Sequence, residues 1–424
     1  MSIATSLKAT GFAEVIVVLR PKKGAQLAAD DASVPAKVLR HLKSSPFSQD
    51  SALLEVLNAR GGTRTARAAA GGTSATAISA AAVSTTKARH YPNLGIVLGI
   101  VDRTSLAALR KETGVKEVMT APQLRLIKPV AMVPTQVSAG YTWGLSALGV
   151  DKLHAQGITG KGVLVGHLDT GVDASHPALA GVVKVFAEFD SLGNQVPGAR
   201  AKDSAEHGTH TAGTIAGQLI QGVQFGVAPG AKLACAMVIE GGNVLARILG
   251  GMNWAVGQKV RILSMSLGLL GQSDAFLSVV QILRARGVLP VFAVGNEGAG
   301  TSRYPGNYVE AMSVGAMDEA GSVADFSSSQ RFKRKKDPIV PDMVGPGVNV
   351  VSCVPDGKYM QMSGTSMATP HIAGLAALLM EAKPEKMIDE IESAIFESCA
   401  LKPGMLVSRA NRGFPDALKA LSLL

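Results

Sequence analysis

The chain has 424 residues, of which 47% are hydrophobic and 17% charged, with 47 glycines; this composition is typical of a globular protein large enough for two or three domains. No apolar run approaches the roughly 20 residues that a membrane-spanning helix needs, so we expect no membrane partner. The formal net charge of +10 lies in residues 1–140, but apart from RPKKG at 20–24 the basic residues are scattered, so nucleic-acid binding is not expected.

The N-terminal region and the cysteines favour a cytoplasmic protein, and export by a route other than a signal peptide stays open. Glu14 precedes the short apolar run VIVVL (15–19) and basic residues follow it, which is the reverse of the charge order in a signal peptide. The three cysteines, Cys235, Cys353 and Cys399, show neither CxxC nor metal-site spacing. Such a sparse, odd set is typical of reduced structural thiols.

The first part of the chain predicts a small α+β domain. In chain order we expect a strand at 13–20, a helix at 34–45, a low-complexity Ala/Gly/Ser/Thr insertion at 61–86, a strand at 94–102, a helix at 104–113 and an extended stretch at 115–127. We therefore assign 1–127 to a ferredoxin-like α+β domain. Residues 128–142 begin with a stretch that has two prolines and no periodicity, and they are predicted to be a linker.

From residue 143 the pattern changes to apolar strands that alternate with helices. Strands are expected at 162–171, 232–239, 260–268 and 288–298, and helices at 245–257 and 276–287. Near-continuous apolar strands separated by helices indicate a mainly parallel sheet covered on both faces. In such sheets ligands bind outside the carboxyl ends of the strands, where this sequence places polar residues.

Three segments contain residues suited to nucleophilic catalysis: HLDTGVDASHP (167–177), EHGTHTAGTIAG (206–217) and SGTSMATPHIAG (363–374). Asp169 follows a strand, and His207 and Ser366 begin predicted helices. A serine needs an adjacent base, and a buried carboxylate orients an imidazole for that task. Each residue alone also has a structural explanation, as a turn residue, a structural histidine and a helix cap. Together, the order Asp, His, Ser indicates a catalytic triad.

Seven blocks resemble those of the subtilisin-like serine proteases, from about residue 143 to near the C-terminus. They are DTGVDASHP, HGTHTAGTIAG, GVAPGAKL, MSLG, AVGNEG, VGPGVNVVS and GTSMATPHIAG. The resemblance implies a three-layer α/β/α fold for 143–424 and serine endopeptidase activity on polypeptides. It also implies that Asp169, His207 and Ser366 form the triad, with Asn296 and the main-chain N–H of Ser366 as the oxyanion hole.

The resemblance further implies residues that bind the substrate. Two segments, Ser266-Leu267-Gly268 and Glu240-Gly241-Gly242, would pair with the backbone of an extended peptide. Ala293-Val294-Gly295 would form one wall of the pocket for the side chain before the cut. Arg303 falls at the floor of that pocket in the family. Either it favours acidic or polar side chains there or it turns to solvent.

No cofactor is expected, and the usual calcium site of the family is expected to be lost. Relatives hold calcium with an Asp after SHP and an Asn in the loop after the catalytic helix, whereas this chain has Ala178 and Ile220. Aliphatic side chains supply no oxygen ligand, so we expect that site to bind no metal. Calcium elsewhere in the chain stays open.

The position and element order of the N-terminal domain resemble the inhibitory propeptide of these proteases. Two functions are therefore considered: a self-processing zymogen cut within 128–142, or a chain kept inhibited by its own N-terminal domain that serves as a binding or sensing module. A basic nucleic-acid binder is a remote third. The sequence does not predict the oligomeric state.

Several neighbours of the triad are expected to be structural. His210 and Thr211 would pack on the helix of His207, while Asp173 and His176 would shape a turn. His371 is expected to be a core or sheet contact. Pro370 is placed in the first turn of its helix, where no intrahelical N–H is needed.

Overall fold

The structure is a computed structural model that describes residues 2–20, 33–42, 88–239 and 244–424. The chain divides into two compact units, residues 1–90 with 95–120, and residues 91–94 with 121–424. The predicted insertion at 61–86 lies outside the described residues, as do Glu240, Gly241 and Gly242.

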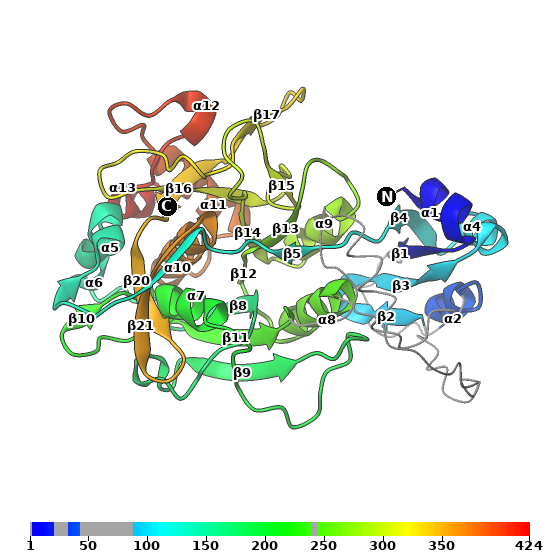
Figure 1. The fold of residues 1–424 in the computed structure, drawn as a ribbon, viewed down its shortest axis with the longest axis horizontal. Helices are drawn as coiled ribbons and strands as arrows, with labels where there is room; N and C mark the ends of the chain where they lie inside the picture. Colours follow the sequence, from blue (N-terminus) through cyan, green and yellow to red (C-terminus); the bar gives the residue numbers. More distant parts are fainter. Residues whose placement is uncertain (1, 21–32, 43–87, 240–243) are drawn as a thin grey trace, which may run out of the picture. The chain divides into compact units, whose positions relative to one another are not determined.

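The first unit contains a four-stranded sheet with the order β2-β3-β1-β4 (Figure 1). Its elements are α1 (Ile3–Thr10), β1 (Ala13–Leu19), α2 (Ser33–Leu39), β2 (Arg89–Tyr91), β3 (Ile96–Val101), α4 (Arg103–Leu109) and β4 (Val115–Thr120). Strand β1 pairs antiparallel with both β3 and β4. Valines of β1 and β3 and leucines of α4 form the core of this unit, because one face of the sheet is covered by helices. Helix α1, which was not anticipated, begins where the Ser2 side chain accepts the N–H of Thr5.

The second unit is built on a seven-stranded parallel sheet with the order β19-β16-β14-β12-β8-β11-β9. The strands are β8 (Leu164–Asp169), β9 (Val183–Glu188), β11 (Lys232–Met237), β12 (Ile262–Met265), β14 (Leu289–Ala293), β16 (Met312–Met317) and β19 (Met343–Pro346). The four strands that were predicted from apolar runs, β8, β11, β12 and β14, lie within the expected ranges. The predicted strand at 260–268 is divided into β12 and a separate β13 (Leu267–Leu270) that joins another sheet.

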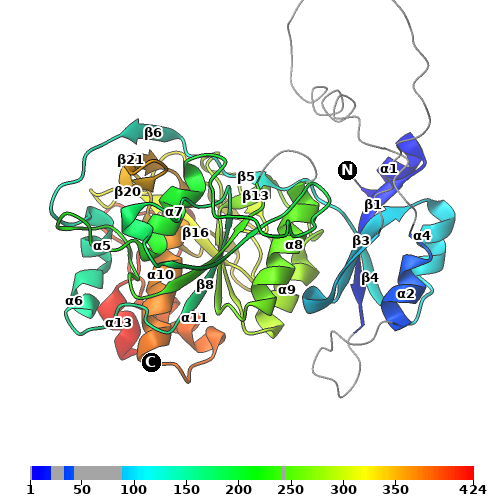
Figure 2. The ribbon, with the colours of Figure 1, turned by 90° about the horizontal axis from the view of Figure 1, so that it is seen from below.

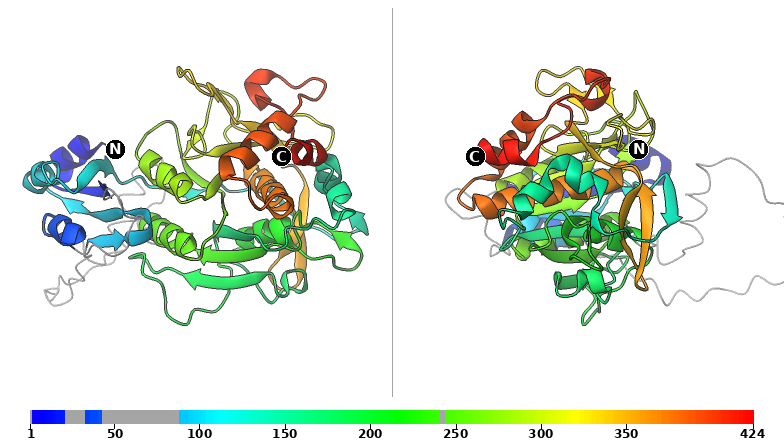
Figure 3. Two further views of the ribbon diagram at one scale, coloured as in Figure 1. Left: turned by 180° about the vertical axis from the view of Figure 1, so that it is seen from behind. Right: turned by 90° about the vertical axis from the view of Figure 1, so that its left-hand side faces the viewer.

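Helices cover both faces of this sheet, which confirms the three-layer α/β/α prediction. Helices α7 (His207–Ala216) and α10 (Thr365–Ala382) lie on one face, and α8 (Val244–Gly257) and α9 (Leu277–Ala285) on the other (Figures 2 and 3). The remaining helices of this unit are α5 (Trp143–Leu148), α6 (Val150–His154), α11 (Ile388–Ser398), α12 (Val407–Ala410) and α13 (Ala417–Ser422). Across the described ranges, none of the helices combines the length and apolarity needed to cross a membrane.

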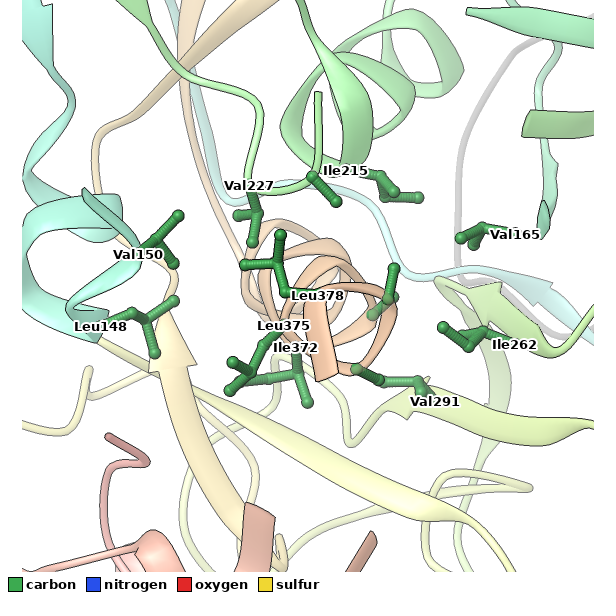
Figure 4. Close-up of a cluster of buried hydrophobic side chains, with 14 of the residues drawn as sticks. Leu148, Val150, Val165, Ile215, Val227, Ile262, Val291, Ile372, Leu375 and Leu378 are labelled. Carbon is green, nitrogen blue, oxygen red and sulfur yellow. The ribbon is translucent and has the colours of Figure 1, made fainter. Parts of the chain in front are cut away.

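Helix α10 is the centre of the main hydrophobic core. Every residue from Thr365 to Met380 is buried, as expected for a helix surrounded by other elements. Its apolar side chains pack against residues of α7 and of the sheet strands (Figure 4). Figure 4 labels Ile372, Leu375 and Leu378 of α10, Ile215 of α7, and Val165, Ile262 and Val291 of the sheet. The buried helix fixes the position of its own N-terminus, and therefore of Ser366, relative to the strands.

The extended stretch predicted at 115–127 contains β4 and a further short strand, whereas residues 128–142, predicted to be a linker, also contain strands. The first compact unit ends at Thr120, and the following residues form β5 (Arg125–Leu126), β6 (Ala131–Pro134) and β7 (Gly140–Tyr141). Strand β5 joins a sheet of order β15-β13-β5, and β6 joins one of order β20-β21-β6, with β15 (Arg303–Tyr304), β20 (Val350–Val354) and β21 (Lys358–Ser363). Short strands next to prolines carry no local periodicity, and their hydrogen-bond partners come from far along the chain.

Candidate active site

The parallel sheet and two helices bring the three predicted triad residues to one edge of the second unit. Asp169 is the last residue of β8, a central strand, and His207 is the first residue of α7. Ser366 is the second residue of α10. All three are at least 97% buried, with exposed fractions of 2%, 3% and 0%. The N–H groups of the first helical turn have no intrahelical partner, so Ser366 lies where developing negative charge is stabilised.

Asp169 and His207 form a direct, buried hydrogen bond. Nδ1 of His207 lies 2.7 Å from Oδ1 of Asp169, and the N–H of Thr170 donates to the same oxygen at 2.7 Å. Burial by itself raises the pKa of the Asp169 carboxyl. The charge of His207 and its hydrogen bond outweigh that effect, so this pKa lies below its ordinary value. An ionised Asp169 holds the His207 proton on Nδ1 and leaves Nε2 free to act as a base.

The Ser366 hydroxyl is not hydrogen-bonded to His207 in this conformation. Its Oγ donates to Sδ of Met367 at 3.3 Å, and among the described residues Nε2 of His207 has no hydrogen-bond partner. A rotation about χ1 of Ser366 changes the direction of the hydroxyl without moving the helix. Hydrogen bonds between nucleophile and base are often long or open before a substrate is bound.

The side-chain amide of Asn296 is held in one orientation by Thr365. Oδ1 of Asn296 accepts the main-chain N–H of Thr365 at 2.9 Å and its hydroxyl at 2.8 Å. Nδ2 is thereby left to donate to the carbonyl oxygen of Lys128 at 2.9 Å. A Cβ on Gly364 would lie 2.9 Å from Oγ of Ser366 and 3.2 Å from Nδ2 of Asn296, so a larger residue there would displace one or both side chains.

The segment that follows the first unit runs through this site as an extended peptide. Leu126 and Arg125 of β5 pair antiparallel with Leu267 and Gly268 of β13, and the N–H of Ile127 donates to O of Ser266 at 2.9 Å. Beyond Lys128, the N–H of Val130 donates to O of Ser363 at 2.8 Å, and β6 continues antiparallel to β21. Residues 125–134 are thus paired on both sides of Ser366.

Arg303 and Glu297 form an ion pair beside Gly295. Nε of Arg303 lies 2.9 Å from Oε1 of Glu297, with a second bond from Nη2, and Nη1 donates to O of Gly268 at 3.2 Å. A Cβ on Gly295 would lie 2.7 Å from Oε2 of Glu297. Ala293 and Val294, the other expected pocket residues, are fully buried. Arg303 therefore has its charge compensated, a geometry that neither sequence-based alternative anticipated.

Pro370 differs from its expected place in the first turn. Helix α10 begins at Thr365, so Pro370 lies beyond that turn and leaves the carbonyl of Ser366, four residues earlier, without a helical N–H. The hydroxyl of Ser266 donates to that oxygen at 3.2 Å. Ser266 thus stabilises the start of the helix that carries Ser366, in addition to accepting the N–H of Ile127.

The other histidines near the triad have structural contacts. Nε2 of His210 donates to O of Val350 at 3.0 Å, and Nδ1 of His371 donates to O of Met367 at 2.8 Å. Burial lowers the pKa of His210 to about 3 and that of His371 to about 4, so both are neutral at physiological pH.

The residues at the position of the usual calcium site do not fit a hard cation. The described ranges contain no cluster of three or more His, Cys, Asp or Glu side chains that could hold a metal. Ala178 has no side-chain oxygen, its N–H donates to Nδ1 of His176 at 3.1 Å, and its carbonyl accepts the N–H of Gln218 at 2.8 Å. Calcium binds through oxygen ligands. The absence of this site stays a prediction.

Four contributors to the site were missed or given another role in the sequence. Thr365 orients Asn296, Glu297 neutralises Arg303, and Lys128 supplies the carbonyl that Asn296 binds. His167 lies two residues before Asp169 on β8, and that spacing alone places both on the same face of the strand. The other three depend on contacts that no local pattern reports.

The fold and site together define a class of three-layer α/β/α proteins that carry a buried aspartate–histidine pair and a serine at a helix N-terminus, at the carboxyl end of a parallel sheet. A sequence profile of the Subtilase family matches residues 160–414, and the chain belongs to that family.

Similar proteins include several named proteases. The chain is 38% identical over 266 residues to the M-protease of Shouchella clausii (strain KSM-K16), covering 62% of this chain and 65% of that protein. It is 39% identical over 245 residues to subtilisin Savinase of Lederbergia lenta, covering 57% and 85%. With subtilisin E of Bacillus subtilis (strain 168) the identity is 34% over 287 residues, covering 66% and 71%. The chain thus spans just under two thirds of the length of the M-protease.

Proposed function

We propose that this protein is a serine endopeptidase that acts on polypeptides and is made as a self-processing zymogen. The observation that carries the proposal is the arrangement around one peptide carbonyl. Asn296 donates to the carbonyl oxygen of Lys128, Gly364 packs closely against Ser366 and Pro129, and His207 is bound to Asp169. Membership of the Subtilase family supports the same activity.

In the proposed mechanism, Oγ of Ser366 attacks the carbonyl carbon while Nε2 of His207 takes the hydroxyl proton. Asp169 stabilises the resulting imidazolium. Nδ2 of Asn296 and the main-chain N–H of Ser366 stabilise the oxyanion of the tetrahedral intermediate. His207 then protonates the leaving nitrogen, the C–N bond breaks and an acyl-enzyme remains. Water attacks this ester in a second step, with His207 as base and then acid, and releases the carboxylate and the free Ser366 hydroxyl.

Antiparallel pairing supports an extended polypeptide as substrate. Ser266, Leu267 and Gly268 bind the backbone of residues 125–127 on one side of Ser366. Main-chain pairing of this kind gives affinity with little dependence on sequence. We propose that a substrate in trans pairs in the same way once residues 125–134, the resident segment, have left the site. Leu124 and Ile127 are each 1% exposed, so we expect a substrate to carry aliphatic residues at the corresponding positions.

The resident segment supports processing close to the start of the predicted range 128–142. The carbonyl next to Asn296 belongs to the Lys128–Pro129 bond. The nitrogen of that bond carries Cδ of the proline ring in place of a hydrogen, which crowds the atom that His207 must protonate. We therefore expect cleavage of the intact chain to be slow. The same feature favours the second candidate, a chain that keeps its own segment in the cleft and works as a binding or sensing module.

Intact mass over time distinguishes these functions. Purified wild type and Ser366→Ala are incubated side by side, and each is also treated with a fluorophosphonate. A zymogen gives a split near residues 128–142 in wild type alone, with the label on Ser366. An inhibited module stays whole and is not labelled. If the unlabelled chain also fails to hydrolyse added peptides, the endopeptidase proposal is contradicted.

A further inference from the structure

A second buried histidine lies behind the Asp169–His207 pair. His167 is on β8, on the same face as Asp169, and is 1% exposed. Its Nε2 lies 2.8 Å from Oγ1 of Thr211 and 4.0 Å from Oδ2 of Asp169. Thr211 is on α7, one helical turn after His207. The sequence-based interpretation treated Thr211 as a packing residue, but its hydroxyl lies between His167 and Asp169.

The two oxygens of Asp169 have different partners. Oδ1 binds His207 and the N–H of Thr170, both at 2.7 Å. For Oδ2, the hydroxyl of Thr211 at 3.4 Å is the single hydrogen-bond donor within the described part of the chain. The hydroxyl of Thr170, the next residue, is directed elsewhere, to Oδ1 of Asp203 at 2.6 Å. The orientation of Oδ2 therefore depends on the direction in which Thr211 donates.

The tautomer of His167 determines that direction. In the described structure Nδ1 of His167 is buried without a hydrogen-bond partner. A proton on Nδ1 would be a buried N–H without an acceptor, which is rare, whereas a proton on Nε2 donates to Oγ1 of Thr211. The hydroxyl proton of Thr211 is then shared among O of His207 at 3.1 Å, O of Gly208 at 3.2 Å and Oδ2 of Asp169. The ionised carboxylate is the strongest acceptor of the three.

We propose that His167 is a positioning residue for the catalytic aspartate, because its Nε2–H fixes the Thr211 hydroxyl as a donor to Oδ2 of Asp169. The inference rests on the proposed role of Asp169 and His207 as a catalytic pair. His167 acts through Thr211 and does not touch the reacting atoms. Withdrawal of charge by this donor weakens the hold of Asp169 on the imidazolium of His207. Loss of the donor therefore makes His207 bind its proton more tightly.

The titratable groups around His167 indicate that it influences Asp169 mainly through the hydrogen bond from Nε2–H to Oγ1 of Thr211. Asp169 and His207 are the titratable groups that face it. Cys235, opposite His167 on β11, has its thiol pKa raised by burial and is neutral. Asp203 faces Thr170 and Thr209. Burial lowers the pKa of His167 to about 4, so its own charge is absent at neutral pH.

The test compares His167→Val and Thr211→Val, which remove the donor chain, with His167→Gln, whose amide N–H can replace Nε2–H. Cys235→Ala is the matched control, because it also removes buried volume beside β8 without removing this hydrogen bond. All are made in the full chain with Ser366→Ala, and the low-field resonance of the proton between His207 and Asp169 is titrated by NMR. The pH midpoint of this resonance should rise in both valine variants and should return to the value of the parent chain in His167→Gln.

A second measurement uses the same substitutions with Ser366 present. We expect kcat on a peptide substrate to fall about tenfold in the valine variants with KM unchanged, and the acid limb of its pH profile to move to higher pH. An unchanged midpoint in both valine variants, or an equal shift in Cys235→Ala, overturns the proposal. The NMR titration needs no hydrolysis, so a shifted midpoint without Ser366-dependent hydrolysis counts against the endopeptidase function alone.

Discussion

Nδ2 of Asn296 donates a hydrogen bond to the main-chain carbonyl of Lys128, 2.9 Å away, across 168 positions of sequence. The amide cannot turn freely, because Thr365 donates twice to its Oδ1. The donor is therefore held in one place, and a peptide carbonyl of the chain itself lies there; in the proposed mechanism this is the position at which the tetrahedral intermediate carries negative charge.

Replacement of Asn296 by Ala should lower kcat by about 100- to 1000-fold with little change in KM, the range known for loss of an oxyanion-hole donor from a subtilisin. The measurement is hydrolysis of a peptide substrate by processed protein. Thr365→Val is the companion variant. It keeps the main-chain N–H and removes one of the two donors to Oδ1, so its effect should be several-fold smaller. Equal activity of Asn296→Ala and wild type would remove Asn296 from the mechanism.

Pro129→Ala should accelerate self-cleavage by about tenfold or more, which corresponds to about 1.4 kcal/mol of activation free energy. The substitution restores an N–H at the leaving nitrogen and relieves the crowding by the ring. Intact mass and N-terminal sequencing follow the new terminus at residue 129. Pro134→Ala, farther along β6, is the control and should leave the rate unchanged. If wild type and Pro129→Ala split at the same rate, the proline does not limit processing.

The Glu297–Arg303 pair should set the charge preference of the pocket beside Gly295. Glu297→Gln leaves the Arg303 charge uncompensated and should raise kcat/KM for acidic side chains before the cut by about tenfold. Arg303→Gln should favour basic side chains by a similar factor, and the double variant should return to the wild-type profile. Peptide-library profiling measures all three. A purely apolar preference in every variant would show that the pair does not reach the substrate.

His371 should contribute to acid instability. Burial lowers its pKa in the folded chain to about 4 from an ordinary 6.5, so the unfolded chain binds the proton more tightly. Its contribution to stability is complete above pH 6.5 and is lost as pH falls towards 4, by at most about 3 kcal/mol. Urea unfolding of Ser366→Ala with and without His371→Gln should show a shallower decline in the glutamine variant between these pH values. Parallel declines would contradict this assignment.

Calcium at the site lost through Ala178 and Ile220 should contribute nothing to stability. Melting of Ser366→Ala in EDTA and in excess calcium should give the same Tm, because an aliphatic residue cannot replace an oxygen ligand. Ala178→Asp is the informative counterpart. If calcium raises the Tm of the parent chain in a saturable way, two variants interpret the rise. A further increase in Ala178→Asp would show that the calcium binds elsewhere in the chain. Loss of the rise in Gln218→Ala, next to Ala178, would contradict the prediction.

The sequence alone predicted the architecture of the second unit. Buried parallel strands such as β8, β11 and β14 are continuous apolar runs, and burial on both faces imposes that pattern locally. Asp169, His207 and Ser366 could be selected because they lie at strand or helix ends within short motifs. The predicted boundaries of these strands and helices agree with the structure within a few residues. These features are local consequences of burial and helix capping, so the sequence contains them directly.

Only the tertiary structure decided which distant groups meet. The segment at 121–134 has no periodicity of its own, and its pairing with β13 and β21 depends on edges formed by residues more than 130 positions later. The same holds for the Lys128 carbonyl at Asn296, for Glu297 beside Arg303, and for Thr211 between His167 and Asp169. Hydrogen bonds and ion pairs of this kind join side chains through space, and the order of residues along the chain does not record them.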